Sequence, residues 1–240
     1  MRHSGSVDFR SDGIRLLGAA LVDLVLPAEC AGCTAPPSVG AWCARCAERL
    51  GAPAWIALSG GPLVLTAGRY TGPLRTALLR YKERGRRDLA APLARHLLPV
   101  LDEVLPDPPA VTWLVPAPSR PAAARARGGD HVARLVRVIA AARPDIRVAR
   151  ALALARHTRD SVGLDAAQRA ANLAGRLHVR HGASPPPGSR VVLVDDIVTT
   201  GATLCACRDT LADFGITADT AVALCDATSG RDDHEHPAAW

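Results

Sequence analysis

The chain has 240 residues, enough for one full hydrophobic core and a small additional segment. Hydrophobic residues make up 48% and charged residues 22%, as in an ordinary globular protein. Aromatic residues reach only 3%, so Ala, Val and Leu must fill the core. The net charge of +6 admits a solvated basic surface, a site for a polyanionic small ligand, or a nucleic-acid surface.

The apolar run over 16–26 is too short to cross a bilayer, because a membrane span needs about 20 apolar residues. Asp23 interrupts this run, and no clean signal-peptide cleavage pattern follows it. We therefore expect a cytoplasmic protein without a membrane span. In such a reducing compartment the seven cysteines are thiols or metal ligands rather than disulfides.

Two C-x-x-C pairs form a short knuckle over 30–46, after an expected helix over 14–26. Four thiolates at this spacing suit tetrahedral Zn²⁺ in a structural site, and Gly32 permits the tight turn between the first two. A redox dithiol pair and buried metal-free cysteines are the alternatives. The four expected zinc ligands are Cys30, Cys33, Cys43 and Cys46. The other three cysteines, Cys205, Cys207 and Cys225, are expected to be small core residues.

Strand-like and helix-like segments alternate through the remainder of the chain. We expect strands over 63–70, 111–115, 146–151, 191–194 and 217–224, and helices over 72–81, 89–101, 131–142, 165–173 and 202–214. This alternation predicts an α/β fold with a parallel sheet and right-handed crossovers. The expected organisation is an N-terminal helix and knuckle over 1–60, a main domain over 61–226 and a disordered tail over 227–240.

The segment 191–204 is the most informative stretch of the sequence. Four aliphatic residues form a buried strand, and the adjacent acids Asp195 and Asp196 are expected at its carboxyl end, where ligands bind in open α/β sheets. A helix N-terminus follows and can hold a phosphate through its free N–H groups. The acids suit ribose hydroxyls or Mg²⁺. The expected phosphate-binding residues are Thr199, Thr200, Gly201, Ala202 and Thr203. The alternative is an ordinary strand followed by a capped helix.

Other basic residues and histidines give weaker signals. The loop expected over 116–129 carries several arginines that can bind phosphate groups, or that can simply be solvated. Arg80 and Lys82 are further phosphate candidates, with a solvated helix end as the alternative. The histidines show no metal or nucleophile pattern, so we expect ordinary surface or loop residues at His131, His157, His178 and His181.

The segment Val-Asp-Asp-Ile-Val-Thr-Thr-Gly-Ala-Thr over 194–203 resembles the motif that binds 5-phosphoribosyl-1-pyrophosphate (PRPP) in type I phosphoribosyltransferases. The resemblance implies a type I phosphoribosyltransferase-like fold, with Asp195 and Asp196 on the ribose and Mg²⁺, and 199–203 around the 5-phosphate. It also implies a pyrophosphate loop at Ala117, Pro118, Ser119 and Arg120, and a flap that begins at Arg125 and Arg127.

Four further elements are similar to the ComF (competence protein F) branch of that family. They are the knuckle after Leu26-Pro27, the Leu-x-Arg-x-Lys-x-x-Gly element over 78–85, the Val-Pro-x-Pro-x-Arg loop over 115–120, and the Arg/Asn helix over 168–173. The chain departs from the branch where Arg-Gly-Phe-Asn-Gln is usual, since 127–131 reads Arg-Gly-Gly-Asp-His. The Gln that usually follows an Arg-x-x-Thr element is also missing after 156–158.

The resemblance implies an enzyme that binds Mg·PRPP and transfers the phosphoribosyl group to a nitrogen acceptor with release of pyrophosphate. The alternative is a non-catalytic competence factor that binds PRPP, or the ribose-phosphate of single-stranded DNA, and meets a competence-machinery protein through its zinc knuckle. A purely structural partner protein is a third interpretation. The residues identify no general base and no acceptor.

Overall fold

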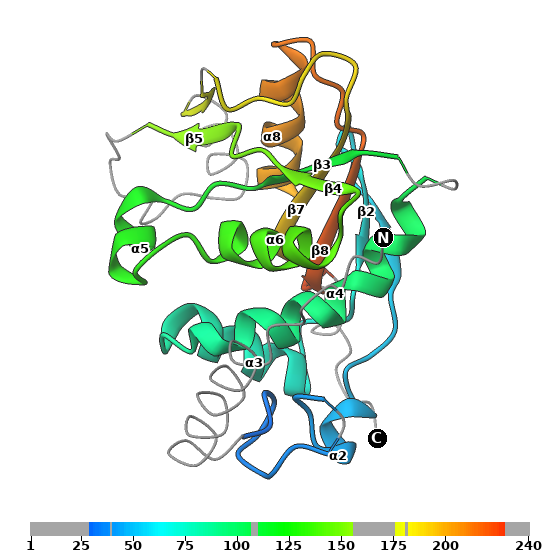
Figure 1. The fold of residues 1–240 in the computed structure, drawn as a ribbon, viewed down its shortest axis with the longest axis vertical. Helices are drawn as coiled ribbons and strands as arrows, with labels where there is room; N and C mark the ends of the chain where they lie inside the picture. Colours follow the sequence, from blue (N-terminus) through cyan, green and yellow to red (C-terminus); the bar gives the residue numbers. More distant parts are fainter. Residues whose placement is uncertain (1–28, 39, 107–109, 156–175, 181, 229–240) are drawn as a thin grey trace, which may run out of the picture.

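A mostly parallel six-stranded sheet organises the protein, in a computed structural model that describes residues 29–38, 40–106, 110–155, 176–180 and 182–228 (Figure 1). The strand order is β1-β2-β8-β7-β3-β4. Neighbouring strands are parallel except β1, which runs antiparallel to β2 at one edge. The strands are β1 (Ala54–Ala57), β2 (Leu63–Thr66), β3 (Thr112–Pro116), β4 (Ile146–Val148), β7 (Arg190–Val198) and β8 (Thr220–Asp226).

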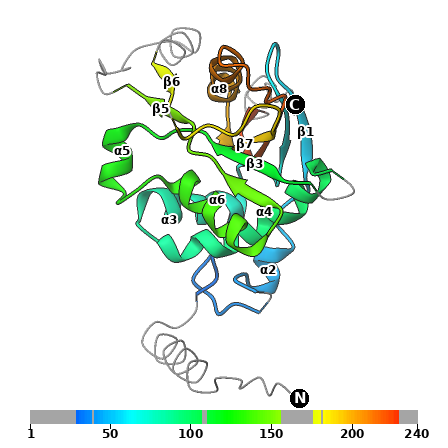
Figure 2. The ribbon, with the colours of Figure 1, turned by 45° about the horizontal axis from the view of Figure 1, so that its top comes forward.

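Helices cover both faces of this sheet (Figures 1 and 2). The helices α3 (Gly72–Glu83), α4 (Ala90–Val104) and α6 (His131–Ala142) lie on one face, and α8 (Ala202–Ala212) lies on the other. A short 3₁₀ turn, η1 (Arg87–Leu89), joins α3 to α4. Leu93, Leu97 and Leu101 recur every four residues on α4 and are fully buried, which is the spacing that places apolar side chains on one helix face.

Two smaller elements lie beside the carboxyl ends of β3 and β4. An antiparallel ribbon is formed by β5 (Leu152–Leu154) and β6 (Leu177–Val179). A short helix, α5 (Pro121–Ala126), follows β3. The expectation of a continuous loop over 116–129 is therefore wrong: Pro121 stands in the first turn, where proline is favoured, and alanines follow it.

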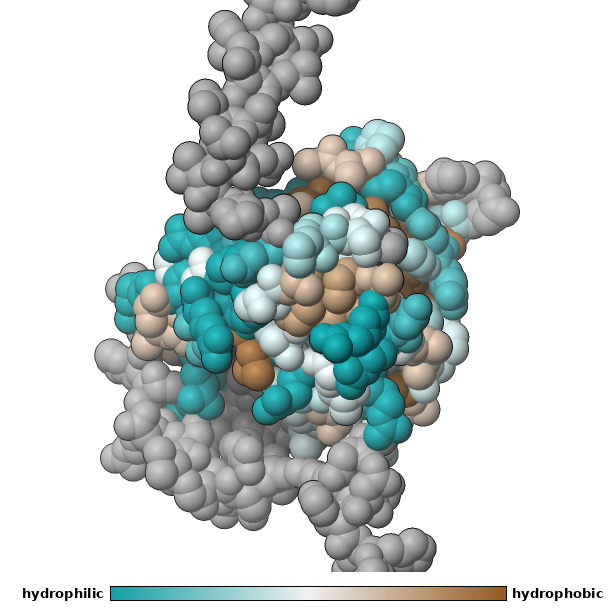
Figure 3. All heavy atoms as spheres, turned by 90° about the horizontal axis from the view of Figure 1, so that it is seen from below, coloured by the Kyte–Doolittle hydropathy of each residue, from teal (hydrophilic) through white to brown (hydrophobic). Residues whose placement is uncertain are grey.

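The cysteine knuckle, with its short helix α2 (Ala44–Ala47), packs against α3 and α4 at the end of the molecule seen in Figure 3. Cys30, Trp42 and Cys46 belong to the same buried cluster as Leu74 and Leu78 of α3. In the face that Figure 3 shows, small apolar patches are interspersed with hydrophilic residues. The knuckle therefore shares the main core on the α3 face of the sheet.

The sequence places the main elements correctly and their ends less well. The helix expected over 131–142 is found at those bounds. The strand expected over 191–194 extends from 190 to 198, whereas that over 63–70 ends at Thr66 and that over 146–151 ends at Val148. The strands β1, β5 and β6 were not expected. The helices expected over 14–26 and 165–173 and the tail after 228 lie outside the described residues, and the domain boundary near 60 stays a prediction.

None of the helices in the described ranges has the length and apolar character that a membrane span requires.

Candidate functional site

The acid pair lies inside β7 rather than beyond its carboxyl end, which corrects the expected strand boundary. Successive side chains of a strand point to opposite faces of the sheet. Asp196 follows this rule with Val192 and Val194, whose side chains belong to the cluster under α3, α4 and α6. Asp195 follows it with Leu193 on the face that α8 covers. The two carboxylates therefore have different surroundings.

Asp196 is buried, with 6% of its surface exposed, and its carboxylate is bound by two basic side chains. Lys82 Nζ of α3 lies 2.7 Å from Asp196 Oδ2, and His131 Nε2 contacts the same oxygen. Burial acts to raise the pKa of Asp196, but the hydrogen bond from His131 and the charge of Lys82 outweigh it and lower the pKa below its usual range. Asp196 is thus held as an anion.

His131 is a buried partner of the acid pair, so the expectation of an ordinary surface or loop histidine is wrong for this residue. It opens α6, whose N-cap Asp130 accepts a hydrogen bond from Ala133 N at 3.0 Å. Tyr81 of α3 donates through its hydroxyl to the carbonyl of His131 at 2.7 Å. The contact between His131 and Asp196 could not be predicted from the apolar pattern of α6, because this pattern does not show which polar group the first turn of the helix meets.

Asp195 accepts a hydrogen bond from the backbone N–H of Asp196 at 2.8 Å. Burial and the neighbouring charge of Asp196 raise the pKa of Asp195 well above its usual value. Its side chain remains partly accessible, whereas that of Asp196 is enclosed. Of the two acids, Asp195 is the more accessible to a ligand, and the ion pairs with Lys82 and His131 are made by Asp196.

The residues after β7 form a turn into α8. Thr199 and Thr200 are exposed, and Ala202 and Thr203 are partly buried at the start of the helix. Gly201 has φ of 73°, in the left-handed region that favours glycine. A Cβ on Gly201 would lie 2.4 Å from Leu58 Cδ2, so the loop between β1 and β2 packs directly against this turn. Two exposed threonines and the N-terminus of an eleven-residue helix therefore lie together at the end of β7.

The loop after β3 lies beside β7 and reaches the acid pair through His131. The backbone N–H of Ala117 donates to the carbonyl of Val194 at 2.8 Å. Ser119 N donates to Asp130 Oδ2 at 3.1 Å, and Ser119 Oγ lies 3.4 Å from His131 Nδ1. Pro118 is partly buried and Arg120, which precedes α5, is exposed. The expected pyrophosphate loop and the acid pair are thus adjacent in the fold.

The expected flap begins at Arg125 and Arg127. Arg125 lies in the last turn of α5, and Arg127 caps the end of this helix. Arg127 Nη2 forms an ion pair with Glu83 Oε1 of α3 at 3.1 Å. Arg127 also lines a cavity of about 580 Å³ together with Lys82 and Arg87. Arg125 lines a different cavity on the other side of α5.

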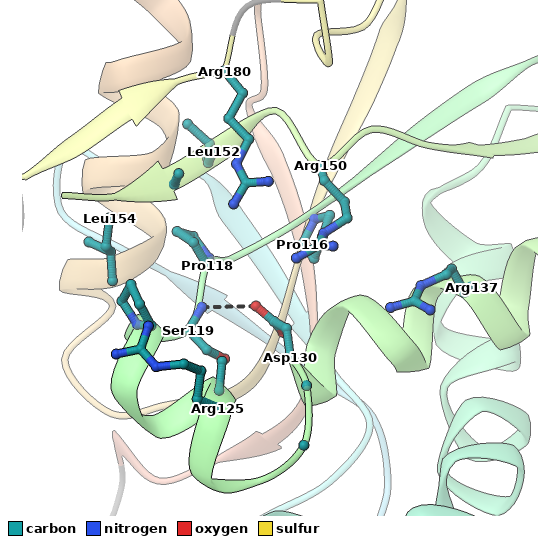
Figure 4. A pocket seen from close by; sticks show the side chains of 15 residues that line it. Pro116, Pro118, Ser119, Arg125, Asp130, Arg137, Arg150, Leu152, Leu154 and Arg180 are labelled. Carbon is teal, nitrogen blue, oxygen red and sulfur yellow. Dashed lines mark hydrogen bonds between the residues drawn. The ribbon is translucent and has the colours of Figure 1, made fainter. Parts of the chain in front are cut away.

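That second cavity, of about 460 Å³, is bounded by the loop after β3, α5, α6 and the β5–β6 ribbon (Figure 4). Four arginines line it, and Ser119 and Asp130 form part of its wall. Sequence reasoning included only Arg125 among these four. The others are Arg137, Arg150 and Arg180.

The four knuckle cysteines converge as their spacing predicts. Each Sγ lies within 4.8 Å of the other three, and the Sγ atoms of Cys33 and Cys43 are 3.7 Å apart. Ligands at about 2.3 Å from a tetrahedral zinc are separated by about 3.8 Å, so the cluster can hold that ion. Burial acts to raise the pKa of Cys30, but hydrogen bonds from the N–H groups of Cys43, Gly32 and Cys33 lower it to about 7, which favours a thiolate ligand.

Arg80 joins the knuckle to α3, so it is not a solvated residue at the helix end. Its Nη1 donates to the carbonyls of Cys30 and Cys33 at 3.0 and 3.2 Å, and its Nη2 lies 2.8 Å from Glu29 Oε2. Gly32 is required here, since a Cβ would lie 2.5 Å from Pro73 Cβ and 3.1 Å from the Sγ of Cys46. Close packing and the hydrogen bonds of Arg80 therefore hold the knuckle against α3.

Residues 129–239, just under half of the chain, match the family model described as phosphoribosyl transferase domain. No curated protein matches the sequence. Among solved structures, a lysine-to-arginine variant of hypoxanthine phosphoribosyltransferase from Trypanosoma cruzi, in a ternary complex with substrates, has 16% identity and a TM-score of 0.34 over 66% of this chain and 74% of that one. A structure from a study of an invariant aspartic acid in HPRTs, its glutamic acid mutant, has 17% identity and a TM-score of 0.34 over the same shares.

The matched range contains the acid pair, the turn after β7 and the start of α6. Together with the sheet, it identifies an α/β fold of phosphoribosyltransferase type, with a four-cysteine cluster near the N-terminus. The fold class expected from the sequence is confirmed.

Proposed function

We propose that the protein binds Mg·PRPP at the carboxyl end of β7, with the 5-phosphate on residues 199–203 and the ribose beside Asp195 and Asp196. The observation that carries this proposal is the continuous unit of partly accessible acid, left-handed Gly201 and helix N-terminus. A sugar phosphate is the ligand class that needs hydroxyl acceptors and an anion site side by side.

In this proposal the two acids have different tasks. Asp195 accepts hydrogen bonds from ribose hydroxyls or binds Mg²⁺ because its side chain is partly accessible. Asp196 is held by Lys82 and His131 and keeps these two side chains beside the sugar. Magnesium, when bound with PRPP, would neutralise charge on the pyrophosphate.

The loop after β3 supports the placement of the pyrophosphate. Ala117 is tied to Val194, and Ser119 contacts His131, so the loop is held next to the acid pair. Backbone N–H groups and Arg120 would bind the pyrophosphate as it leaves the anomeric carbon. Transfer of the phosphoribosyl group to a nitrogen acceptor is the reaction that this arrangement supports.

We also propose that zinc occupies the knuckle in a structural role. Four sulfur ligands close the coordination shell, which leaves no open position for a substrate. The ion would hold the loop that Arg80 clamps to α3.

The ComF branch is the proposed place of this chain within the family. Two residues of the element shared with that branch have defined contacts here: Arg80 holds the knuckle, and Lys82 binds Asp196. His131, which stands where the branch usually has Gln, binds the same carboxylate. A role in competence or single-stranded DNA uptake belongs to this part of the proposal.

Thermal unfolding with Mg·PRPP tests the binding proposal. A ligand at 100 times its dissociation constant stabilises the native state by about 2.7 kcal/mol, which in a chain of this size raises the Tm by roughly 5–11 °C. Mg²⁺ with ribose 5-phosphate and Mg²⁺ alone are the controls. No rise with PRPP would contradict the proposal.

Pyrophosphate release across a panel of nucleobases and amines then tests turnover. Release with one acceptor class, lost in Asp195→Asn, supports the enzyme. Binding of PRPP without release, together with salt-sensitive binding of single-stranded DNA, would favour the competence factor.

A further inference from the structure

The cavity between α5, α6 and the β5–β6 ribbon has a chemistry that the phosphoribosyl site does not use. We call it the arginine cavity and define it by Arg125, Arg137, Arg150 and Arg180, with Leu152 and Leu154 on its apolar wall. In Figure 4 the guanidinium groups of Arg150 and Arg180 extend from the strand segments into the same space, and Arg137 extends toward it from α6. Three separate parts of the chain thus bring cationic groups to one hollow.

The positive charge of the arginine cavity exceeds the negative charge of its wall, because four arginines and one acid line it. Asp130 is the acid in its wall, and both of its oxygens are engaged by backbone groups: Oδ1 by Ala133 N at 3.0 Å and Oδ2 by Ser119 N at 3.1 Å. Within the described ranges no ion pair joins any of the four arginines to an acid. Guanidinium groups that outnumber the carboxylates around them favour a multiply charged anion, and their planar forks suit phosphate oxygens.

The size and the wall of the cavity favour an organic phosphate over an inorganic one. A volume of about 460 Å³ falls within the range of small-molecule sites and exceeds what a bare phosphate fills. Leu152, Leu154 and Pro118 give one side an apolar surface against which a flat ring can pack. A nucleoside phosphate combines a ring with the charge that the arginines need.

The cavity is separate from the ribose-phosphate site but shares one loop with it. None of the residues 195–203 lines it, whereas Pro118 and Ser119 of the loop after β3 do. Ser119 also contacts His131, which binds Asp196. The cavity therefore borders the proposed pyrophosphate loop without including the acid pair or the turn after β7.

We infer that the arginine cavity binds a nucleoside phosphate as a second ligand, at the same time as PRPP, and that this ligand influences PRPP binding through Ser119, His131 and Asp196. A ligand in the cavity would contact Pro118 and Ser119 of the loop after β3, which is the loop proposed to meet pyrophosphate. Coupling of this kind is reciprocal, so PRPP and the nucleotide must change each other's affinity by the same factor.

Calorimetric titration of the full chain with ADP, GDP and UDP tests this inference, first alone and then at saturating Mg·PRPP. We expect one nucleotide per chain in both titrations. Arg150→Ala combined with Arg180→Ala removes two cationic groups from the cavity and should weaken nucleotide binding at least tenfold. Both side chains are exposed, so we expect their loss to leave the fold intact. Arg45→Ala combined with Arg95→Ala removes the same charge from exposed sites elsewhere and should leave binding unchanged.

Four results would overturn the inference. Competition between nucleotide and PRPP, with loss of both in Asp195→Asn/Thr200→Ala, would place the nucleotide in the phosphoribosyl site. An equal loss of PRPP affinity in the Arg150/Arg180 variant would make the cavity part of the PRPP site. Inorganic pyrophosphate binding as tightly as ADP would refute the nucleoside class. Single-stranded DNA binding that needs Arg150 and Arg180, without nucleotide binding, would assign the cavity to nucleic acid. A failure of PRPP to bind would refute the proposed function and the coupling that rests on it, whereas nucleotide binding to the cavity would still be decided by the titration of the free protein.

Discussion

Replacement of Lys82 by methionine probes the buried ion pair under β7. The Lys82 side chain is 19% exposed and the Asp196 side chain is 9% exposed. The substitution therefore leaves a nearly enclosed carboxylate without the charge of Lys82. Loss of one partner from a buried pair costs about 3–5 kcal/mol, and we expect the lower end because His131 stays in contact with Asp196. In a chain of this size, a loss of about 3 kcal/mol lowers the Tm by roughly 6–12 °C.

Chemical denaturation of Lys82→Met, Asp196→Asn and the double variant measures this cost. The destabilisation of the double variant should be smaller than the sum of the two single effects. Each single change leaves one buried charge without its partner, whereas the double change removes both charges. A double variant whose loss of stability equals the sum of the two single losses would refute the argument that this pair is buried and coupled. A loss under about 1 kcal/mol for Lys82→Met would also refute it.

The same variant changes the acid sensitivity of the fold. The pKa of Asp196 is lowered in the folded protein, so its contribution to stability is present above the unfolded pKa of about 3.9 and is lost as the pH falls through the folded pKa. Lys82→Met raises the folded pKa toward the unfolded one. We therefore expect the stability of the variant to depend less on pH below about pH 4 than that of the wild type.

The remaining predictions concern the turn, the other acid and the knuckle. Gly201→Ala should lower the Tm and abolish the PRPP-induced shift, because a Cβ at φ of 73° collides with Leu58; unchanged binding would contradict this. Asp195→Asn should raise the Tm at pH 7. The pKa of Asp195 is raised in the folded protein, so ionisation of this residue lowers the stability as the pH rises, and the gain in the variant should vanish below about pH 4. Cys46→Ala should lose bound zinc in elemental analysis, and chelation of the wild type should lower its Tm. Arg80→Met should expose the knuckle to limited proteolysis while Arg45→Met does not.

The sequence predicts the sheet and the turn into α8 because both depend on local patterns. Four consecutive aliphatic residues identify β7, and a glycine between threonines identifies the turn into α8. The four cysteines converge as expected because a C-x-x-C spacing fixes two ligands at a time.

The partners of Asp196 are not predictable in this way. Lys82 and His131 are 114 and 65 residues away from it in sequence, and only the packing of α3 and α6 on one face of β7 brings them together. Likewise, Arg137, Arg150 and Arg180 come from three segments that share no motif. The edge strand β1 lacks a buried face, so its sequence shows no alternation that would identify it.

Calorimetric titration of the purified chain with Mg·PRPP tests the central claim most directly. The account predicts one PRPP bound per chain, and at least tenfold weaker binding by the variant that combines Asp195→Asn with Thr200→Ala. Equal affinities for the wild type and this variant would contradict the placement of the sugar phosphate at the end of β7.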